Sequence, residues 1–411
     1  MDSYSRTAAN ASPSSHRSIS SLDALKSSMP SRSLVFLLAI TAGLVVMNIY
    51  YNQPILNEIA GSFKIGSSAV AWVATATQLG YAAGLLFVLP IGDSVDRKHL
   101  IIGTTIFSSV ALSMIPLAPN LPMMLLSSFA VGFTSVTPQL AVPYAAGLVP
   151  GAGRGKVVGM VMSGLLIGIL LSRTLSGLIG SRFSWQIVFW SGAGAMVLLS
   201  VLLHIALPSQ PVHGSVPYGR LLASLPRLLA TEPILRRHSI LGALGFGTFG
   251  AFWTTLAFYL HSRPEHYGAD VSGMFGLVAV TGALVAPLAG HLGERWTPRQ
   301  VNGLCFSLVL LAFIIMLFSE QFTLPMLTLG VLLLDAGVQG NQIANQARIY
   351  TLSPALHSRI NAAYMVIYFI GGALGSLIGA QAWGLAGWPA VCATGIAFSS
   401  LALLFLWIQK K

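Results

Sequence analysis

Polar side chains form a stripe within an otherwise apolar stretch near the C-terminal end of the chain. Asp335, Gln339, Gln342 and Gln346 are spaced at i, i+4, i+7 and i+11, which places them on one face of a helix. Asn345 flanks this face. A carboxylate in such a place can bind and release a proton, and the amides can hydrogen-bond a polar solute. The alternative interpretation is that the amides join neighbouring helices by hydrogen bonds.

A second group of polar residues lies in the first long apolar run of the chain. Asn48 and Asn52 are four residues apart and so share a helix face, and Gln53 follows directly before Pro54. Because proline restricts the residue before it, we expect the regular helix to end here. Asn52 and Gln53 are then expected either to line the mouth of a polar cavity or merely to cap the helix end.

Two charged residues are expected within the apolar runs themselves. Asp335 is the only carboxylate deep in any run, and a charge at the centre of a bilayer costs about 2.5–3.5 kcal/mol on insertion scales. Arg173 is the one basic residue expected inside a run, which makes it a candidate partner for Asp335. The alternative for Arg173 is that its long side chain reaches the membrane surface.

The apolar runs that contain these residues are expected to be helices that cross a membrane. Of 411 residues, 55% are hydrophobic and only 8% are charged, whereas soluble domains carry about 25% charged residues. A bilayer core of about 30 Å needs roughly 20 apolar residues in a helix, and backbone groups in lipid must be satisfied within the segment. The sequence therefore predicts an all-α membrane protein with twelve transmembrane helices, at residues 34–56, 67–91, 100–117, 122–147, 157–179, 187–206, 239–260, 271–291, 301–318, 324–346, 361–383 and 389–408.

The positions of the basic residues predict the orientation of these spans. With the N-terminus inside, 18 of the 22 lysines and arginines fall in cytoplasmic segments. This bias predicts that both termini are cytoplasmic. The net charge of +11 then reflects the lysines and arginines that keep these segments on the cytoplasmic side. Because the charges are scattered over short turns, no nucleic-acid binding is expected.

Two loops 201 positions apart indicate that the chain is duplicated. Residues 89–98 read LPIGDSVDRK and residues 290–299 read GHLGERWTPR, so Asp93 aligns with Glu294 and Lys98 aligns with Arg299. Each loop ends one uncharged run and begins the next. A short turn of acid and base between apolar spans, repeated in both halves, is typical of duplicated polytopic transporters.

The expected organisation is two six-helix pseudo-repeats joined by a basic linker. Residues 1–33 are rich in serine and have no apolar run, which predicts a disordered cytoplasmic tail. Residues 34–206 form the N-terminal bundle, 207–238 the cytoplasmic linker and 239–411 the C-terminal bundle. Leucines of the linker fall on one helical face, which predicts a short helix on the inner membrane surface, kinked at Pro226.

On these features the chain resembles the major facilitator superfamily, specifically its twelve-span branch of drug–proton antiporters and sugar-efflux proteins. In that family the turn between spans 2 and 3 carries Gly-x-x-x-Asp-Arg-x-x-Arg-Lys. Asp93, Arg97 and Lys98 match the acid and two of the bases, whereas Leu89 stands for the glycine and Ser94 for the first arginine.

The resemblance implies a gating role for the charges of both loops. An acid near helix ends, with bases beside it, would act as a charged latch that holds the two halves closed on the cytoplasmic side. The alternative is that these residues only anchor tight turns on the cytoplasmic side. The gating residues implied are Asp93, Arg97, Lys98, Glu294, Arg295 and Arg299.

Two signatures of the antiporters within this family are altered. Many of these antiporters have an arginine in span 4, four residues before a glycine. Here the glycine is Gly132, and Ser128 stands in place of the arginine. The span 5 motif has Gly-Pro followed by paired glycines, whereas here Leu165 follows Gly164 and only Gly168 remains of the rest.

The resemblance implies a secondary active transporter that works by alternating access, with spans 1, 4, 7 and 10 lining the central cavity. Proton-coupled efflux of a small organic solute is the expected activity. A proton-coupled uptake permease or a uniporter is the alternative. An integral-membrane enzyme is a remote alternative, because the sequence holds no phosphate-binding loop and no set of metal ligands.

The same resemblance implies a protein of the inner or plasma membrane. It is expected to work as a monomer among membrane lipids, with protons and a small molecule as its partners and with no cofactor. The polar stripes suit sugars, amphiphilic drugs and amino-acid derivatives alike, so the substrate stays open at this point.

The topology can be tested with single cysteines in a background without cysteine. Because lysine and arginine stay on the cytoplasmic side, cysteines at Ser14, His213 and Pro298 should react only with membrane-permeant reagents in intact cells. Cysteines at Ala60 and Glu265 should react from outside. Labelling of His213→Cys by an impermeant reagent would contradict the twelve-span arrangement.

Overall fold

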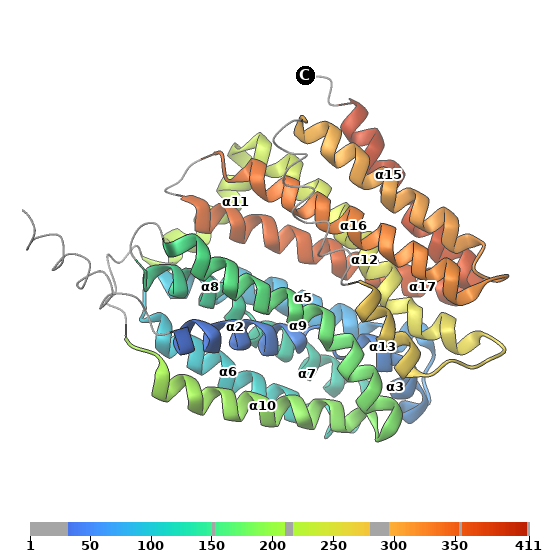
Figure 1. Ribbon diagram of the computed structural model, residues 1–411, viewed down its shortest axis with the longest axis horizontal. Coiled ribbons are helices and arrows are strands. Elements are labelled where there is room, and N and C mark those ends of the chain that lie inside the picture. The colour runs from blue at the N-terminus through green and yellow to red at the C-terminus, as the bar shows by residue number, and fades with distance from the viewer. Residues whose placement is uncertain (1–31, 150–152, 210–216, 280–295, 353–355, 409–411) are drawn as a thin grey trace, which may run out of the picture.

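The computed structural model describes residues 32–149, 153–209, 217–279, 296–352 and 356–408, and every regular element in these ranges is a helix (Figure 1). The helices run roughly along one direction. Those of the N-terminal half, coloured blue to green, gather in the lower part of the view, and those of the C-terminal half gather above them (Figure 1). The predicted all-α fold is confirmed.

The N-terminal half consists of long helices and short connecting ones. Its elements are α2 (Arg32–Met47), η1 (Gln53–Ile55), α3 (Leu56–Phe63), α4 (Ser67–Val70), α5 (Trp72–Phe87), η2 (Leu89–Asp93), α6 (Arg97–Met114), α7 (Leu121–Thr134), α8 (Thr137–Gly147), α9 (Arg154–Arg182) and α10 (Trp185–Ala206). A linker helix, α11 (Tyr218–Thr231), follows. The C-terminal half contains α12 (Pro233–Ser262), α13 (Ala269–Val278), α15 (Pro298–Leu317), α16 (Thr323–Ile349) and α17 (His357–Ile408).

The observed helices follow the predicted spans, with breaks inside some of them. Eight helices in the described ranges are long and apolar enough to cross a membrane, and two shorter apolar helices accompany them. The first span ends its α-helix at Met47 and continues as the 3-10 turn η1, somewhat before the predicted break at Pro54. Spans 11 and 12 form the single element α17, which is interrupted at Gly387 by a left-handed φ of 65°. Most of the predicted span 271–291 lies outside the described residues.

Side-chain caps define where several helices begin. Asp96 precedes α6 and accepts a hydrogen bond from the backbone N–H of Lys98 at 2.9 Å. Asn120 caps α7 in the same way, and Thr297 caps α15 together with Gln300 in a capping box. The first backbone N–H groups of a helix have no partner within it, and these oxygens supply one. The polar turns between the apolar runs therefore set the helix starts.

Small residues allow close packing of helices within each half. Gly164 and Gly168 of α9 lie against Ala39 and Gly43 of α2, so closely that a Cβ on either glycine would overlap backbone atoms. Gly375 of α17 contacts α12 in the same manner. Close backbone approach is the main source of contact between helices in lipid, where burial of apolar surface offers little gain.

The two halves pack against each other along two pairs of helices. The helix α5 lies beside α17, and α9 lies beside α13. The short elements η1, α3 and α4 also contact α12, α13 and α17. These short elements all come from residues 53–70, which connect the first two predicted spans. The halves are therefore closed at the end of the molecule that carries this connection.

The linker forms the amphipathic helix that its leucines predict. Leu221 and Leu225 of α11 are buried, and Pro226 lies inside the helix. Tyr218 donates a hydrogen bond to the carbonyl of Phe87 at the end of α5, over 2.9 Å. Because α11 also contacts α12 and α17, it connects the two halves through side-chain contacts as well as through the chain.

The packing of α7 on α5 generates a stability prediction. A Cβ at Gly132 would overlap the carbonyl oxygen of Thr77 and lie 2.7 Å from the backbone nitrogen of Tyr81, and neither atom can rotate away. We expect Gly132→Ala to destabilise the fold by about 1–3 kcal/mol. The matched variant Gly103→Ala meets no atom within 4 Å and should keep or slightly raise stability, because alanine favours the helix over glycine.

The two buried free cysteines, Cys305 and Cys392, can report unfolding of detergent-solubilised protein through a thiol-reactive dye. The midpoint of the thermal transition should fall for Gly132→Ala alone. Equal midpoints for the two glycine variants would show that α5 and α7 can separate without cost.

Candidate functional site

Arg173 is buried where the two halves meet, among aromatic rings from both of them. It belongs to α9 and is only 1% exposed. Its guanidinium carbon lies 4.0 Å from the ring centre of Trp253, 4.7 Å from that of Tyr50 and 5.1 Å from that of Phe249. Cations over aromatic faces are attracted by the electrons of the ring. The side chain points into the protein, so the alternative in which Arg173 reaches the membrane surface is wrong.

The polar contacts of Arg173 leave part of the guanidinium without a partner. Its Nε donates to Oε1 of Gln53 at 2.8 Å, and Nη1 lies 3.5 Å from the carbonyl of Ile169 on the same helix. The Nη2 atom is buried and has no hydrogen-bond partner within the described part of the chain. Arg173 has no carboxylate within 4.0 Å there either. A buried cation is therefore held by a neutral amide and three rings.

Asp335 lies near Trp253 as well. It belongs to α16, is 3% exposed, and has no hydrogen-bond partner for Oδ2 among the described residues. Its carboxyl group lies next to the indole of Trp253 and within electrostatic reach of Arg173. The indole N–H of Trp253 is also buried without a hydrogen bond of normal geometry. Two opposite charges thus face the same tryptophan without forming a direct ion pair.

Two other members of the α16 stripe contact α17. Gln342 accepts a hydrogen bond from the hydroxyl of Tyr368 at 3.3 Å, and Gln346 donates to the side chain of Asn361 at 3.3 Å. Gln339 is half-buried. The amides of Gln342 and Gln346 therefore face α17, whereas Asn345 contacts other helices.

Asn345 belongs to a hydrogen-bonded cluster within the C-terminal half. Its Oδ1 accepts from Asn302 of α15 at 3.0 Å and lies 2.7 Å from Nδ1 of His238 of α12. Asn341 donates back to Asn302 at 2.9 Å. Such hydrogen bonds hold helices together inside a membrane. The contacts of Asn345 therefore match the alternative in which it joins neighbouring helices.

Asn48 and Asn52 are buried within the N-terminal half. Asn52 donates to Thr77 of α5 at 3.0 Å, and Asn48 lies 3.5 Å from both Ser135 and the sulfur of Met196. The carbonyl oxygen of each side chain has no partner in the described ranges. Of the residues expected around the first span, only Gln53 contacts Arg173.

The aromatic part of this site has a signal in the sequence that the polar pattern does not contain. Phe246, Phe249 and Trp253 of α12 are spaced at i, i+3 and i+7 and so form one helix face. Tyr50 reaches the same cluster from the turn between α2 and η1. In a span that is apolar on all sides, aromatic spacing alone does not distinguish a site from ordinary packing.

A polar bridge between the halves was also absent from the sequence analysis. Gln78 of α5 donates to the hydroxyl of Ser376 of α17 at 2.9 Å, and Thr254 of α12 donates to the same hydroxyl at 2.9 Å. All three side chains are buried. The Oε1 atom of Gln78 has no partner among the described residues, so the bridge is incomplete.

A second carboxylate lies where the halves meet, outside the predicted spans. Glu58 of α3 faces the start of α13, which belongs to the other half. Burial raises the pKa of the Glu58 carboxyl, the backbone N–H of Ala269 lowers it, and the charge of Asp270 raises it again. Glu58 is therefore an acidic group at the closed end of the interface.

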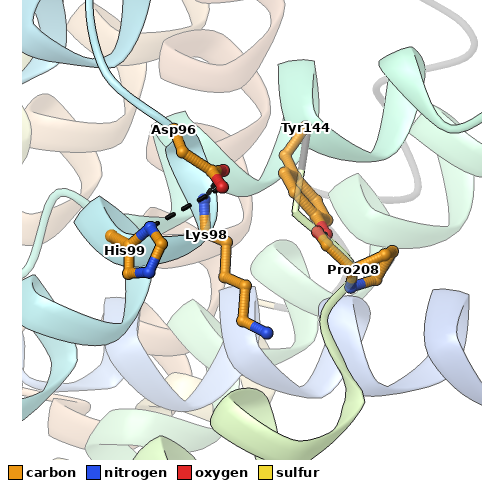
Figure 2. A network of polar contacts seen from close by, with 5 residues as sticks. All are labelled: Asp96, Lys98, His99, Tyr144 and Pro208. Carbon is orange, nitrogen blue, oxygen red and sulfur yellow. Dashed lines mark hydrogen bonds and ion pairs between the residues drawn. The ribbon is translucent and has the colours of Figure 1, made fainter. Parts of the chain in front are cut away.

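The loop at residues 89–98 is held by its own backbone and side chains. Arg97 donates through Nε to the carbonyl of Gly92 at 3.1 Å, which closes the turn. Figure 2 shows Asp96 at the start of α6, where it accepts from the N–H of Lys98 and lies 3.6 Å from Nδ1 of His99. Nearby, Tyr144 donates to the carbonyl of Pro208 at 2.6 Å (Figure 2).

Several of the predicted gating residues lie outside the part of the chain that the structure describes. The side chain of Asp93 lies outside the described residues, and so do Glu294 and Arg295. Arg299 is exposed, and its Nη2 lies 3.5 Å from the carbonyl of Trp407. The latch between the two loops therefore stays a prediction.

Comparison with known proteins agrees with this architecture. Residues 38–376 match the family model of the Major Facilitator Superfamily. The chain is 40% identical to the Uncharacterized transporter YgaY of Escherichia coli O157:H7, over 92% of this chain and 95% of that protein. It is 23% identical to the "Probable sugar efflux transporter" of Helicobacter pylori strain HPAG1, over 90% of this chain and 94% of the other.

A solved structure has the same fold. The crystal structure of the nucleoside transporter NupG superimposes with a TM-score of 0.77 at 15% identity, over 92% of this chain and all of that one. Family and relatives indicate a multi-pass membrane transporter of small molecules and not an enzyme. By its helices, its duplicated halves and its similarity over nearly the whole length, this chain belongs to the Major Facilitator Superfamily.

Proposed function

We propose that this transporter exports a small organic solute from the cytoplasm in exchange for protons, with Asp335 as the proton-binding group. The observation that carries the proposal is the burial of Asp335 at 3% exposure with one carboxyl oxygen unpartnered in the described structure. A buried carboxylate is costly unless it is paired or protonated. Asp335 can therefore be stabilised either by a proton or by a positively charged group.

The placement of the two charges supports coupling to a conformational change. Arg173 is on α9 of the N-terminal half, whereas Asp335 and Trp253 are on α16 and α12 of the C-terminal half. When the two halves rock against each other, the separation between the two charges changes. The electrostatic stabilisation of the Asp335 carboxylate then differs between the two states, which links proton binding to alternating access.

The direction of transport is proposed from two further observations. On the predicted topology, residues 53–70 are outside, so the packing of η1, α3 and α4 on the C-terminal half closes the outer face. An exporter passes through an outward-closed state when it loads its solute from the cytoplasm. The similarity to a protein named as a sugar efflux transporter also favours export. Bacterial relatives favour the inner membrane as its location.

The proton-coupling role is tested by Asp335→Asn in proteoliposomes. Without an ionisable carboxyl group, transport driven by a pH gradient should be abolished. Exchange of labelled for unlabelled substrate should continue, because exchange moves no net proton. The control Glu265→Gln removes an exposed carboxylate and should leave both activities intact. Proton-driven accumulation by well-folded Asp335→Asn protein would remove Asp335 from the coupling step and favour facilitated diffusion.

We also propose that the loop at residues 89–98 takes part in gating. Its support is the local structure: Arg97 closes the turn on Gly92, and Asp96 fixes the start of α6, so the loop is a defined element at the end of α5. A defined loop can present the Asp93 carboxylate to the end of a facing helix when the cytoplasmic side closes.

Neutralising this carboxylate should change the balance between the two conformations. We expect Asp93→Asn to lower the transport rate at least about tenfold, a shift of roughly 1.4 kcal/mol in the equilibrium, with normal insertion. Cysteine accessibility from the two sides measures the balance directly. Wild-type rates with unchanged accessibility would reduce the loop to a topological anchor.

A further inference from the structure

The central site contains two opposite charges that neither pair with each other nor reach water. Arg173 is 1% exposed and Asp335 is 3% exposed. Each retains one buried polar atom without a partner in the described structure, Nη2 of Arg173 and Oδ2 of Asp335. Burying an isolated charge is expensive, and an unsatisfied polar atom adds to that cost. The site therefore lacks an anionic group that would pair with Arg173 and a cationic group that would pair with Asp335.

Both charges neighbour Trp253. The guanidinium of Arg173 lies over the face of the indole at 4.0 Å, and the Asp335 carboxyl lies near the same side chain. The indole N–H has no hydrogen bond of normal geometry among the described residues. One ligand beside this indole could therefore contact both charges.

The charges restrict what such a ligand can be. A simple cation that pairs with Asp335 is repelled by Arg173, and a simple anion that pairs with Arg173 is repelled by Asp335. A neutral polyol can donate and accept hydrogen bonds, but it leaves both charges without a counter-charge. A molecule with one carboxylate and one ammonium group supplies both counter-charges and adds no net charge to the buried site.

The surroundings of the charges favour an apolar side chain on this molecule. Phe249 stacks near Phe246 at 5.2 Å between ring centres, and Phe246 lies 4.2 Å from Tyr368. Phe369 contacts Phe246 at 5.0 Å and Tyr81 of the other half at 4.4 Å. This cluster continues from the rings that surround Arg173. Aromatic rings predominate in this cluster, and among the described residues it contains no charged side chain that could pair with a charge on the ligand's side chain.

We propose that the central site binds a small zwitterion of the α-amino-acid type with an apolar or aromatic side chain. Its carboxylate would accept from Nη2 of Arg173, and its ammonium group would donate to Oδ2 of Asp335. The proposal rests on the proposed transport function and specifies its substrate class.

The same contacts give a reason for exchange with protons. A proton on Asp335 removes the charge that binds the ammonium group. The proton and the zwitterion therefore compete for one carboxylate, and each must leave before the other binds. Competition at a shared group is the arrangement that antiport requires.

The test measures binding of four ligands to the wild-type protein in detergent: three share a phenyl ring and differ in charge, and the fourth is a neutral polyol. The probes are L-phenylalanine, phenethylamine, which lacks the carboxylate, 3-phenylpropionate, which lacks the ammonium group, and methyl β-D-galactoside as a neutral polyol carrying no phenyl ring. Affinity is measured by ligand-induced thermal stabilisation and by equilibrium binding. We expect L-phenylalanine to bind at least about tenfold more tightly than each of the others, because each charge-assisted bond contributes that much or more.

Two variants should change the charge preference in opposite directions. Asp335→Asn removes the repulsion of anions and should bind 3-phenylpropionate more tightly than the wild type. It should bind L-phenylalanine at least about tenfold more weakly, through the amide oxygen that remains, so exchange continues at saturating substrate. Arg173→Gln should bind phenethylamine more tightly than the wild type does, and it should bind L-phenylalanine more weakly. Arg182→Gln, an exposed arginine on the same helix, is the matched control and should keep the wild-type order.

The outcomes separate this inference from the proposed function. The proposal of a zwitterionic ligand is overturned if L-phenylalanine, L-leucine and L-methionine all fail to bind wild-type protein, or if they bind no better than the single-charge analogues. Proton-coupled transport of another solute would then stand by itself. If L-phenylalanine binds as expected but moves no protons in proteoliposomes, the substrate class stands and proton coupling fails.

Discussion

The burial of one guanidinium without a direct counter-ion is the constraint on which the centre of this structure depends. Arg173 cannot lose its charge and cannot reach water, so every group around it must help to hold it. Three aromatic faces and the amide of Gln53 do so. Cation–π contacts contribute about 0.5–2 kcal/mol each, which is less than the cost of removing the charge from water. The arrangement is incomplete until a ligand or a conformational change adds an anion.

The end of the first span contributes two of these groups. Tyr50 and Gln53 follow the end of α2 at Met47 and are three residues apart, so they share one face of the turns that lead into η1, and both contact Arg173. Pro54 keeps this segment from rejoining the helix. A feature that looks like a helix end in the sequence is thus part of the site.

The polar contacts of the protein fall into two classes with different consequences. Those within one half, such as Asn302 with Asn345, hold helices whose apolar surfaces gain nothing from meeting in lipid. Those between the halves, such as Gln78 with Ser376 and Thr174 with the carbonyl of Gly273, must break when the molecule opens at that end. The unpartnered Oε1 of Gln78 lowers the cost of that separation, since the bridge is not fully satisfied.

The sequence by itself determined the helices, the duplicated halves and the two central charges. Backbone satisfaction in lipid leaves no alternative to helices, and Asp335 and Arg173 stand out because charges in such runs are rare. Only the tertiary structure decided which neighbours they meet. A helical period fixes the angle of a side chain about its own axis, whereas its partner depends on how adjacent helices rotate and cross. For that reason Asn345 and Gln342, close together on α16, contact different helices. The helical spacing of the aromatic residues of α12 can be read from the sequence, but for the same reason it does not show that their rings surround Arg173.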